Sequence, residues 1–127
     1  MKTEDTGQGT LETWTVDEVD EALQKGEIAV IDVRTPQEYM FEHIDGALLA
    51  PMGQIRADRL PSMQGRTLVF YCGSSKRSES VARSLLSQGH DRIVHMDGGF
   101  AAWKQAGKAH IGTDMATGAP KRVDSSG

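Results

Sequence analysis

The sequence predicts an α/β domain with a mainly parallel central sheet flanked by helices. Three observations support this fold class. Apolar runs of strand length alternate with segments of helical periodicity along most of the chain. The run Ile28–Val33 is almost continuously apolar and rich in β-branched residues, which is typical of a strand covered on both faces. The links between segments are short, so right-handed crossovers between parallel strands are expected.

Two of the predicted helices begin with recognisable capping patterns. Thr15 and Glu18 have capping-box spacing before a short predicted helix that ends near residue 24. Thr35 and Glu38 repeat this spacing, and Pro36 between them suits the first helical position. The second helix is expected to end at about residue 41.

The remaining elements are predicted from apolar periodicity and turn residues. The clearest helix follows the single cysteine, because apolar side chains recur at helical spacing at Val81, Ala82, Leu85 and Leu86. Strands are expected over residues 28–33, 47–50, 67–71 and 92–96. Shorter helical segments are expected over residues 54–60, ahead of Pro61, and 100–106. Turns are expected over residues 43–46, 64–66 and 97–99.

The sequence predicts one domain over residues 11–108. The chain has 127 residues, which is the size of a single core-forming unit. Residues 1–10 are polar and rich in turn formers, and residues 109–127 are rich in Gly, Thr, Ala and Ser without periodicity. Both ends are therefore predicted to be flexible.

Composition and charge disfavour several classes of partner. The net charge of −4 supplies no basic field for a nucleic-acid backbone. No run approaches the roughly 20 apolar residues that cross a bilayer, and the first 13 residues lack the pattern of a secretion signal. One cysteine allows no internal disulfide and no cysteine-based zinc site, and the histidines have no ligand spacing. The sequence predicts a cytoplasmic protein without a metal site.

The only cysteine ends a predicted strand and begins a loop of small and basic residues. Cys72 follows the apolar run at residues 68–71 and is followed by Gly73, Ser74, Ser75, Lys76, Arg77 and Ser78. Asp32 ends the other apolar strand. Since ligands of parallel α/β folds bind at the carboxyl ends of the strands, Cys72 and Asp32 are expected at the same edge of the sheet.

This loop has the means to activate a thiol. A free cysteine has a pKa near about 8.5 and is mostly protonated at neutral pH. Backbone N–H groups at the start of the following helix, the helix dipole, and the cations of Lys76 and Arg77 would all favour a thiolate. The same groups would hold the anionic end of a substrate, because convergent amides form an anion-binding nest. The hydroxyl groups of Ser74, Ser75 and Ser78 add further donors.

Four segments of this chain resemble the signatures of one protein family. They are Asp32–Tyr39, His43–Ala47, Cys72–Ser78 and Gly98–Trp103. Cys72–Ser78 resembles the active-site loop of the rhodanese family of sulfurtransferases. Asp32–Tyr39 resembles the first signature of that family, and His43–Ala47 resembles its usual continuation. Gly98–Trp103 resembles the C-terminal signature. They occur in the family's order over about residues 14–107. The resemblance implies a single rhodanese-like domain.

The resemblance also implies a reaction and the residues that carry it. The thiolate of Cys72 would take sulfane sulfur from a small anionic donor such as thiosulfate, forming a persulfide. Cyanide or a thiol, including one on a protein, would then accept the sulfur. The substrate-binding residues would be Gly73, Ser74, Ser75, Lys76, Arg77 and Ser78. Asp32 and Arg34 would support the site, and no metal or organic cofactor would be needed.

Neighbouring side chains have structural interpretations. Asp32 could help to hold the loop, whereas Arg34 and Glu38, four residues apart, are expected to pair with each other on the surface. His43 could act as the base for a thiol. A structural role in the turn signature is favoured for it, because an anion nest stabilises a thiolate without a base.

Two positions depart from the family pattern. Ser75 stands where the family usually has glycine. If the loop needs a positive φ there, serine costs on the order of 1 kcal/mol. Asp45 stands where proline is common, which should matter little.

Two other functions compete with sulfur transfer by turnover. The domain could be a sulfur carrier or docking module that does not turn over a small donor, and the sequence does not distinguish this from catalysis. A cysteine phosphatase or arsenate reductase is disfavoured. Four residues separate Cys72 from Arg77, whereas the loops of those enzymes have five.

Overall fold

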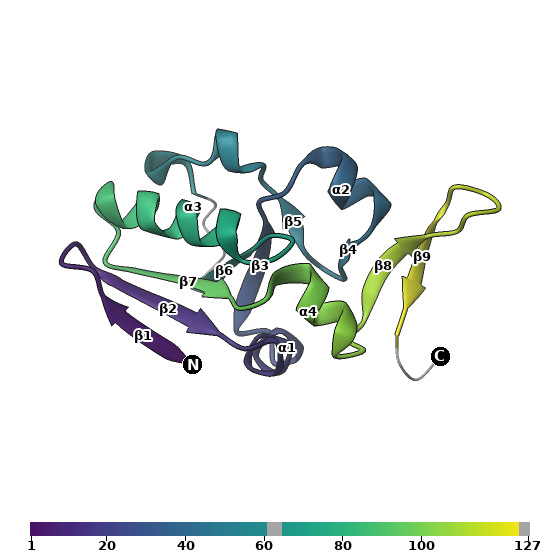
Figure 1. Cartoon of the computed structure of the whole chain (residues 1–127), viewed down its shortest axis with the longest axis horizontal. Coiled ribbons are helices and arrows are strands. Elements are labelled where there is room, and N and C mark those ends of the chain that lie inside the picture. The colour runs from purple at the N-terminus through teal and green to yellow at the C-terminus, as the bar shows by residue number, and fades with distance from the viewer. Residues whose placement is uncertain (61–64, 125–127) are drawn as a thin grey trace.

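A six-stranded sheet forms the centre of the computed structural model, which describes residues 1–60 and 65–124 (Figure 1). The strand order is β1-β2-β7-β6-β3-β5. Strand β1 runs antiparallel to β2, and the other neighbouring strands run parallel. The strands are β1 (Lys2–Asp5), β2 (Thr10–Trp14), β3 (Ile28–Asp32), β5 (Leu48–Leu49), β6 (Thr67–Tyr71) and β7 (Arg92–Met96). The predicted fold class, a mainly parallel α/β sheet, is confirmed.

Helices cover both faces of this sheet. Helices α1 (Val16–Gln24) and α4 (Gly99–Gln105) lie on one face, and α3 (Lys76–Ser87) lies on the other (Figure 1). Because side chains of a strand alternate between faces, Val30 belongs to the buried cluster that includes Trp103 of α4, and the next residue, Ile31, belongs to the cluster that includes Leu85 of α3. This explains the nearly continuous apolar run of β3, all of whose residues are buried.

Short helical elements connect β3 to β6. Helix α2 (Pro36–Phe41) begins with the predicted capping box, in which the Glu38 amide donates to Thr35 Oγ1 at 3.2 Å. Two 3₁₀ turns, η1 (Met52–Gln54) and η2 (Ala57–Arg59), occupy the region where one or two helical turns were expected. Pro61 and part of the turn predicted over residues 64–66 lie outside the described residues.

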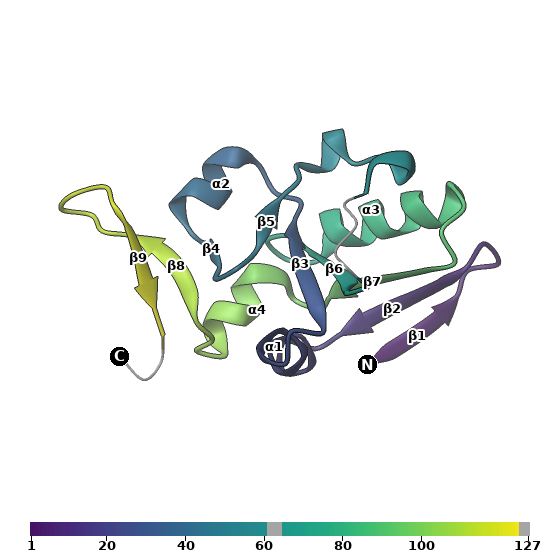
Figure 2. The same ribbon diagram turned by 180° about the vertical axis from the view of Figure 1, so that it is seen from behind.

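The two ends of the chain form strands, which the sequence did not predict. Strand β1 pairs with β2 in a hairpin, and β8 (His110–Thr113) pairs with β9 (Pro120–Val123) in another. The two hairpins lie at opposite ends of the molecule (Figure 2). All four residues of β1 are exposed, so the strand lacks the apolar alternation by which a sequence reveals a strand. The predicted bounds of the domain, 11–108, stay a prediction.

A second, smaller sheet takes up the first half of the turn predicted over residues 43–46, while Asp45 and Gly46 form a turn as predicted. Strand β4 (His43–Ile44) pairs antiparallel with β8, giving the order β4-β8-β9. The hydroxyl of Thr113 also donates to the Phe41 carbonyl at 2.7 Å, which ties the C-terminal hairpin to the end of α2. Pairing partners so distant in sequence leave no local pattern, so the sequence alone does not predict β4.

Strand pairing brings the two predicted site positions together. Asp32, at the end of β3, pairs in register with Tyr71, at the end of β6. Cys72 directly follows Tyr71, and α3 begins four residues later. The prediction that Cys72 and Asp32 share one edge of the sheet is confirmed.

Candidate active site

The sulfur of Cys72 accepts two backbone hydrogen bonds from the loop that follows it. The amide of Ser75 donates to Sγ at 3.2 Å, and the amide of Ser78 donates at 3.3 Å. Helix α3 has no side-chain hydrogen bond at its N-cap, Ser75. The Cys72 sulfur therefore accepts amide protons at the helix start, where a side-chain oxygen usually does so.

These donors favour the ionised form of the cysteine. The Cys72 side chain is fully buried, and burial by itself raises the pKa of a thiol. The backbone amides of Ser78, Ser74 and Ser75, together with the Ser78 hydroxyl, act in the opposite direction. Together these donors lower the pKa by more than burial raises it, so the pKa of Cys72 lies below its ordinary value. The backbone donors therefore offset the burial of Cys72 and favour its thiolate form.

Ser75 adopts the strained backbone that its position suggested. Its φ is 120° and its ψ is −19°, and it is the only non-glycine residue with positive φ in the described part of the chain. This conformation turns the Ser75 amide toward the Cys72 sulfur. The expectation that serine occupies a position suited to glycine is confirmed.

Helix α4 holds the first half of the loop from the other side. The amide of Phe100 donates to the Cys72 carbonyl at 2.8 Å, and the amide of Ala101 donates to the Gly73 carbonyl at 3.2 Å. A Cβ on Gly99 would lie 2.5 Å from the Cys72 carbonyl oxygen, which is too close for any side chain. Gly99 is therefore required for the close approach of α4 to the loop.

The two cations of the loop differ in their surroundings. Arg77 forms two hydrogen bonds with the Glu38 carboxylate of α2, at 2.8 and 3.0 Å. Its guanidinium also lies close to Gly73, 3.2 Å from where a Cβ there would stand. Lys76, at the first residue of α3, is exposed. Arg77 is thus directed across the loop, whereas Lys76 extends to solvent.

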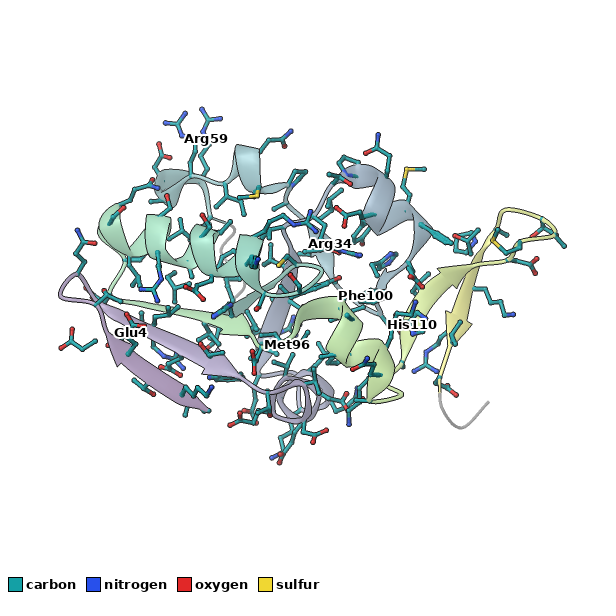
Figure 3. All side chains as sticks on the ribbon, in the orientation of Figure 1. Glu4, Arg34, Arg59, Met96, Phe100 and His110 are labelled. Atoms are coloured by element: carbon teal, nitrogen blue, oxygen red, sulfur yellow. The ribbon has the colours of Figure 1, made fainter. Side chains whose placement is uncertain are left out.

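Asp32 and Arg34 form a buried ion pair beside the loop. Arg34 donates to Asp32 at 2.7 Å through Nη2, and the side chains of Arg34 and Asp32 are 5% and 0% exposed. The hydroxyl of Tyr71 also donates to Asp32, at 2.6 Å. The Arg34 guanidinium lies 4.7 Å from the centre of the Phe100 ring (Figure 3). The prediction that Arg34 pairs with Glu38 on the surface is wrong, because Asp32 binds Arg34 inside the protein and Arg77 binds Glu38.

A comparison with family models identifies the family of this chain. The model of the rhodanese-like domain matches residues 15–106. The chain belongs to the rhodanese-like family. The resemblance seen in the four sequence segments is thereby confirmed, and all four segments lie within the matched residues.

Individual relatives agree with this membership. The rhodanese-like chain is 40% identical over 93 residues to an uncharacterized protein of Synechocystis, covering 73% of this chain and 52% of that protein. It thus spans about half the length of that relative. It is 32% identical over 94 residues to a protein of Coxiella burnetii named thiosulfate sulfurtransferase GlpE, covering 74% of this chain and 82% of that one. The family of this chain therefore includes named sulfurtransferases.

A solved structure shows the same fold. The solution structure of a rhodanese-like domain from Anabaena matches with a TM-score of 0.69 at 25% sequence identity. The match covers 88% of this chain and 86% of the Anabaena chain. The α/β architecture of this rhodanese-like domain is therefore that of its family.

The structure places the predicted site residues of this rhodanese-like domain in two groups. Ser75 and Ser78 bind the Cys72 sulfur, whereas Asp32 and Arg34 form an ion pair that the Tyr71 hydroxyl joins. His43 contacts Tyr39 and is not among the residues that bind the Cys72 sulfur. Its ring stacks on Tyr39 at 3.8 Å between centroids, and its Nδ1 bonds the Tyr39 carbonyl at 2.7 Å.

Sequence reasoning missed one polar residue at the site. His95 of β7 lies 3.0 Å, through Nδ1, from the hydroxyl of Ser78, which contacts the Cys72 sulfur. A single histidine within the otherwise apolar run 93–96 was the available signal. Among residues 1–60 and 65–124 no cluster of His, Cys, Asp and Glu could hold a metal ion, and no helix there is long and apolar enough to cross a bilayer.

Proposed function

We propose that this protein transfers sulfane sulfur through a persulfide on Cys72. The observation that carries the proposal is the pair of backbone N–H groups, from Ser75 and Ser78, that bind the Cys72 sulfur at 3.2 and 3.3 Å. Donors fixed in this way stabilise negative charge on sulfur without reorganising during the reaction. Family membership and the named sulfurtransferases among its relatives support the same reaction class.

In the first step, the Cys72 thiolate attacks the outer sulfur of a donor such as thiosulfate. A bond forms between Sγ and that sulfur, and the sulfur–sulfur bond of the donor breaks. Sulfite leaves with the electron pair of the broken bond, and a persulfide remains on Cys72. Because covalent catalysis divides one difficult transfer into two steps, no cofactor has to carry the sulfur.

In the second step, a thiophilic acceptor attacks the outer sulfur of the persulfide. Cyanide would leave as thiocyanate, and a thiol would leave as a new persulfide. The electron pair of the broken bond returns to Sγ, which regenerates the Cys72 thiolate. The same amides that lower the pKa of Cys72 make this thiolate a good leaving group.

The anionic end of the donor would be held by Lys76 and Arg77. Arg77 can bind two oxygens with parallel hydrogen bonds, as it does with Glu38. Lys76 is exposed and would act as a point charge at the helix start. The loop residues Gly73, Ser74 and Ser75 would line the path of the transferred sulfur.

Mass spectrometry of the intact protein after incubation with thiosulfate tests this proposal. The expected result is a mass gain of one sulfur atom on Cys72, which cyanide removes and which Cys72→Ser lacks. A matched control is Ser80→Ala, which changes an exposed serine of α3 outside the Cys72 loop. If thiosulfate adds no sulfur but a persulfidated protein does, the domain is a carrier and turnover on small donors is rejected. Hydrolysis of an aryl phosphate without persulfide formation would reject sulfur transfer altogether.

A further inference from the structure

His95 is a polar residue within a strand whose other interior residues are apolar. It is 2% exposed and lies between Val94 and Met96 on β7. Val94 and Met96 pack on the side of α4, whereas Ile93, two residues before His95, packs on the side of α3. The alternation of the strand therefore directs His95 toward α3, the helix that follows the Cys72 loop.

Both ring nitrogens of His95 have hydroxyl partners. Nε2 lies 3.0 Å from Oγ1 of Thr13 on β2, and Nδ1 lies 3.0 Å from Oγ of Ser78 on α3. The Ser78 side chain is fully buried, and its Oγ lies 3.7 Å from the Cys72 sulfur. A continuous series of contacts thus runs from Thr13 through His95 and Ser78 to Cys72.

The single hydroxyl proton of Ser78 has three possible acceptors. They are the Cys72 sulfur, the Ser75 carbonyl at 3.1 Å and the Nδ1 atom of His95. If Nδ1 carries the proton of the ring, it donates to Ser78 Oγ and is no longer an acceptor. The Ser78 proton is then free to point at the sulfur, where a negative charge attracts it most strongly.

The surroundings of His95 favour a neutral ring and accommodate a proton on Nδ1. Burial has the largest effect on the pKa of His95 and lowers it. The charges of Glu79 and Asp97 raise this pKa and the charge of Arg83 lowers it, and the net result is a pKa below the ordinary value. The ring is therefore neutral at pH 7 and carries one N–H. The Thr13 hydroxyl can donate to an unprotonated Nε2, and Ser78 Oγ can accept from Nδ1, so the contacts of both nitrogens fit a ring proton on Nδ1.

We propose that His95 is a positioning residue for Cys72. By donating from Nδ1 to Ser78 Oγ, it directs the Ser78 hydroxyl proton toward the sulfur and stabilises the thiolate. This inference deepens the proposed function, because it assigns a residue that prepares the nucleophile of that reaction. His95 acts on the sulfur through Ser78.

Ultraviolet absorbance of the Cys72 thiolate across a pH titration tests the proposal, with Cys72→Ser as the blank. Cys72 is the only cysteine, so the signal has one source. His95→Leu should raise the titration midpoint by about 0.5 to 1 pH unit, as expected when a hydrogen bond to a charged group is weakened. His95→Asn, whose amide can donate near the position of Nδ1, should restore most of the shift.

Two further variants separate positioning from a general loss of structure. Ser78→Ala should raise the midpoint at least as far as His95→Leu, and adding His95→Leu to it should cause no further shift. His90→Leu is the matched control, since the His90 ring contacts the Ala57 carbonyl and none of these residues. An unchanged midpoint in His95→Leu, or additive shifts in the double variant, would overturn the proposal.

A measurement on the unmodified protein covers the case in which His95→Leu does not fold. Nitrogen chemical shifts of the His95 ring, recorded above the pKa of Cys72, should show the proton on Nδ1, and a proton on Nε2 would reject the proposal. Neither experiment uses a sulfur donor. If the titration midpoint depends on His95 but the protein forms no persulfide with any donor, the proposed function is rejected. The role of His95 in positioning Cys72 then still holds.

Discussion

Glu38 binds Arg77 through both of its carboxylate oxygens, at 2.8 and 3.0 Å. The pair joins α2 to the first turn of α3, beside the Cys72 loop. It holds the arginine proposed to bind the donor, and it places a negative charge where an anionic donor would arrive. Glu38 and an anionic donor therefore compete for the same guanidinium.

Glu38→Gln should improve the use of thiosulfate. Glutamine can still complete the capping box with Thr35, so the substitution removes the charge while α2 stays capped. The KM for thiosulfate should fall by about fivefold, which corresponds to about 1 kcal/mol of competing interaction. Steady-state kinetics with thiosulfate and with an uncharged persulfide donor measure this effect. Glu42→Gln, which removes a carboxylate paired with Lys104, is the control. A KM that stays the same, or falls equally for both donors, contradicts the competition.

Arg77→Ala should have the opposite effect. The loss of charge-assisted hydrogen bonds to the donor should raise the KM for thiosulfate by about tenfold or more. Lys76→Ala should raise it less, because Lys76 is exposed and its field is screened by solvent. The uncharged donor should be affected little by either change. Equal losses on both donors would show that these cations do not bind the anionic end of the donor.

The Glu38–Arg77 pair should also affect stability in acid. Hydrogen bonds from Arg77 are the largest cause that lowers the pKa of Glu38, to about 2 from the ordinary value of 4.5. A carboxyl whose pKa is lower in the folded state contributes stability that is present above its unfolded pKa and is lost as the pH falls. The free energy of unfolding should therefore decline between about pH 4.5 and pH 2, and less so in Glu38→Gln. Urea unfolding at several pH values measures the difference, and a difference independent of pH contradicts it.

The sequence predicted the features of the site that depend on local pattern. The apolar runs before Asp32 and Cys72 indicated two parallel strands, and strand pairing places them side by side. The motif around Cys72 indicated a loop of amide donors, and the sulfur accepts two of them. Features of this kind need few residues close together in the chain, so periodicity and turn chemistry reveal them.

The partners of the charged side chains could not be predicted in the same way. Arg34 and Glu38 have the spacing of a helical ion pair, yet Arg34 precedes α2 and points inward to Asp32. Glu38 instead meets Arg77, a residue 39 positions away. The partner of each charged side chain depends on how β3, α2 and α3 pack together. The contact between His95 and Ser78 likewise depends on the packing of β7 against α3.

Asp32→Asn should destabilise the fold strongly. Asp32 is completely buried and accepts hydrogen bonds from Arg34 and Tyr71. Asparagine has nearly the same shape but leaves the Arg34 charge buried without a counter-ion. Breaking a buried pair in this way costs about 3 to 5 kcal/mol. Urea unfolding should show this loss, whereas Asp58→Asn, in an exposed pair with Arg56, should cause no measurable change. A small effect at Asp32 would mean that solvent or another group compensates Arg34.

Ser75→Gly should stabilise the fold without loss of the thiolate. At a φ of 120°, a side chain is strained and glycine is not, so removing the Cβ should gain on the order of 1 kcal/mol. The Ser75 side chain caps no helix, and its amide, which binds the Cys72 sulfur, is retained. Urea unfolding measures the gain, and the titration midpoint of Cys72 should stay the same.

The matched control for this substitution is Ser74→Gly. Ser74 is the neighbouring exposed serine and has no positive φ, so glycine there only increases the freedom of the unfolded chain and should be neutral or destabilising. If both substitutions change stability alike, the backbone at Ser75 stores no strain. If Ser75→Gly is more stable but raises the pKa of Cys72, the serine is retained because it keeps the amide directed at the sulfur. The two measurements together therefore separate the energetic cost of Ser75 from its effect on the nucleophile.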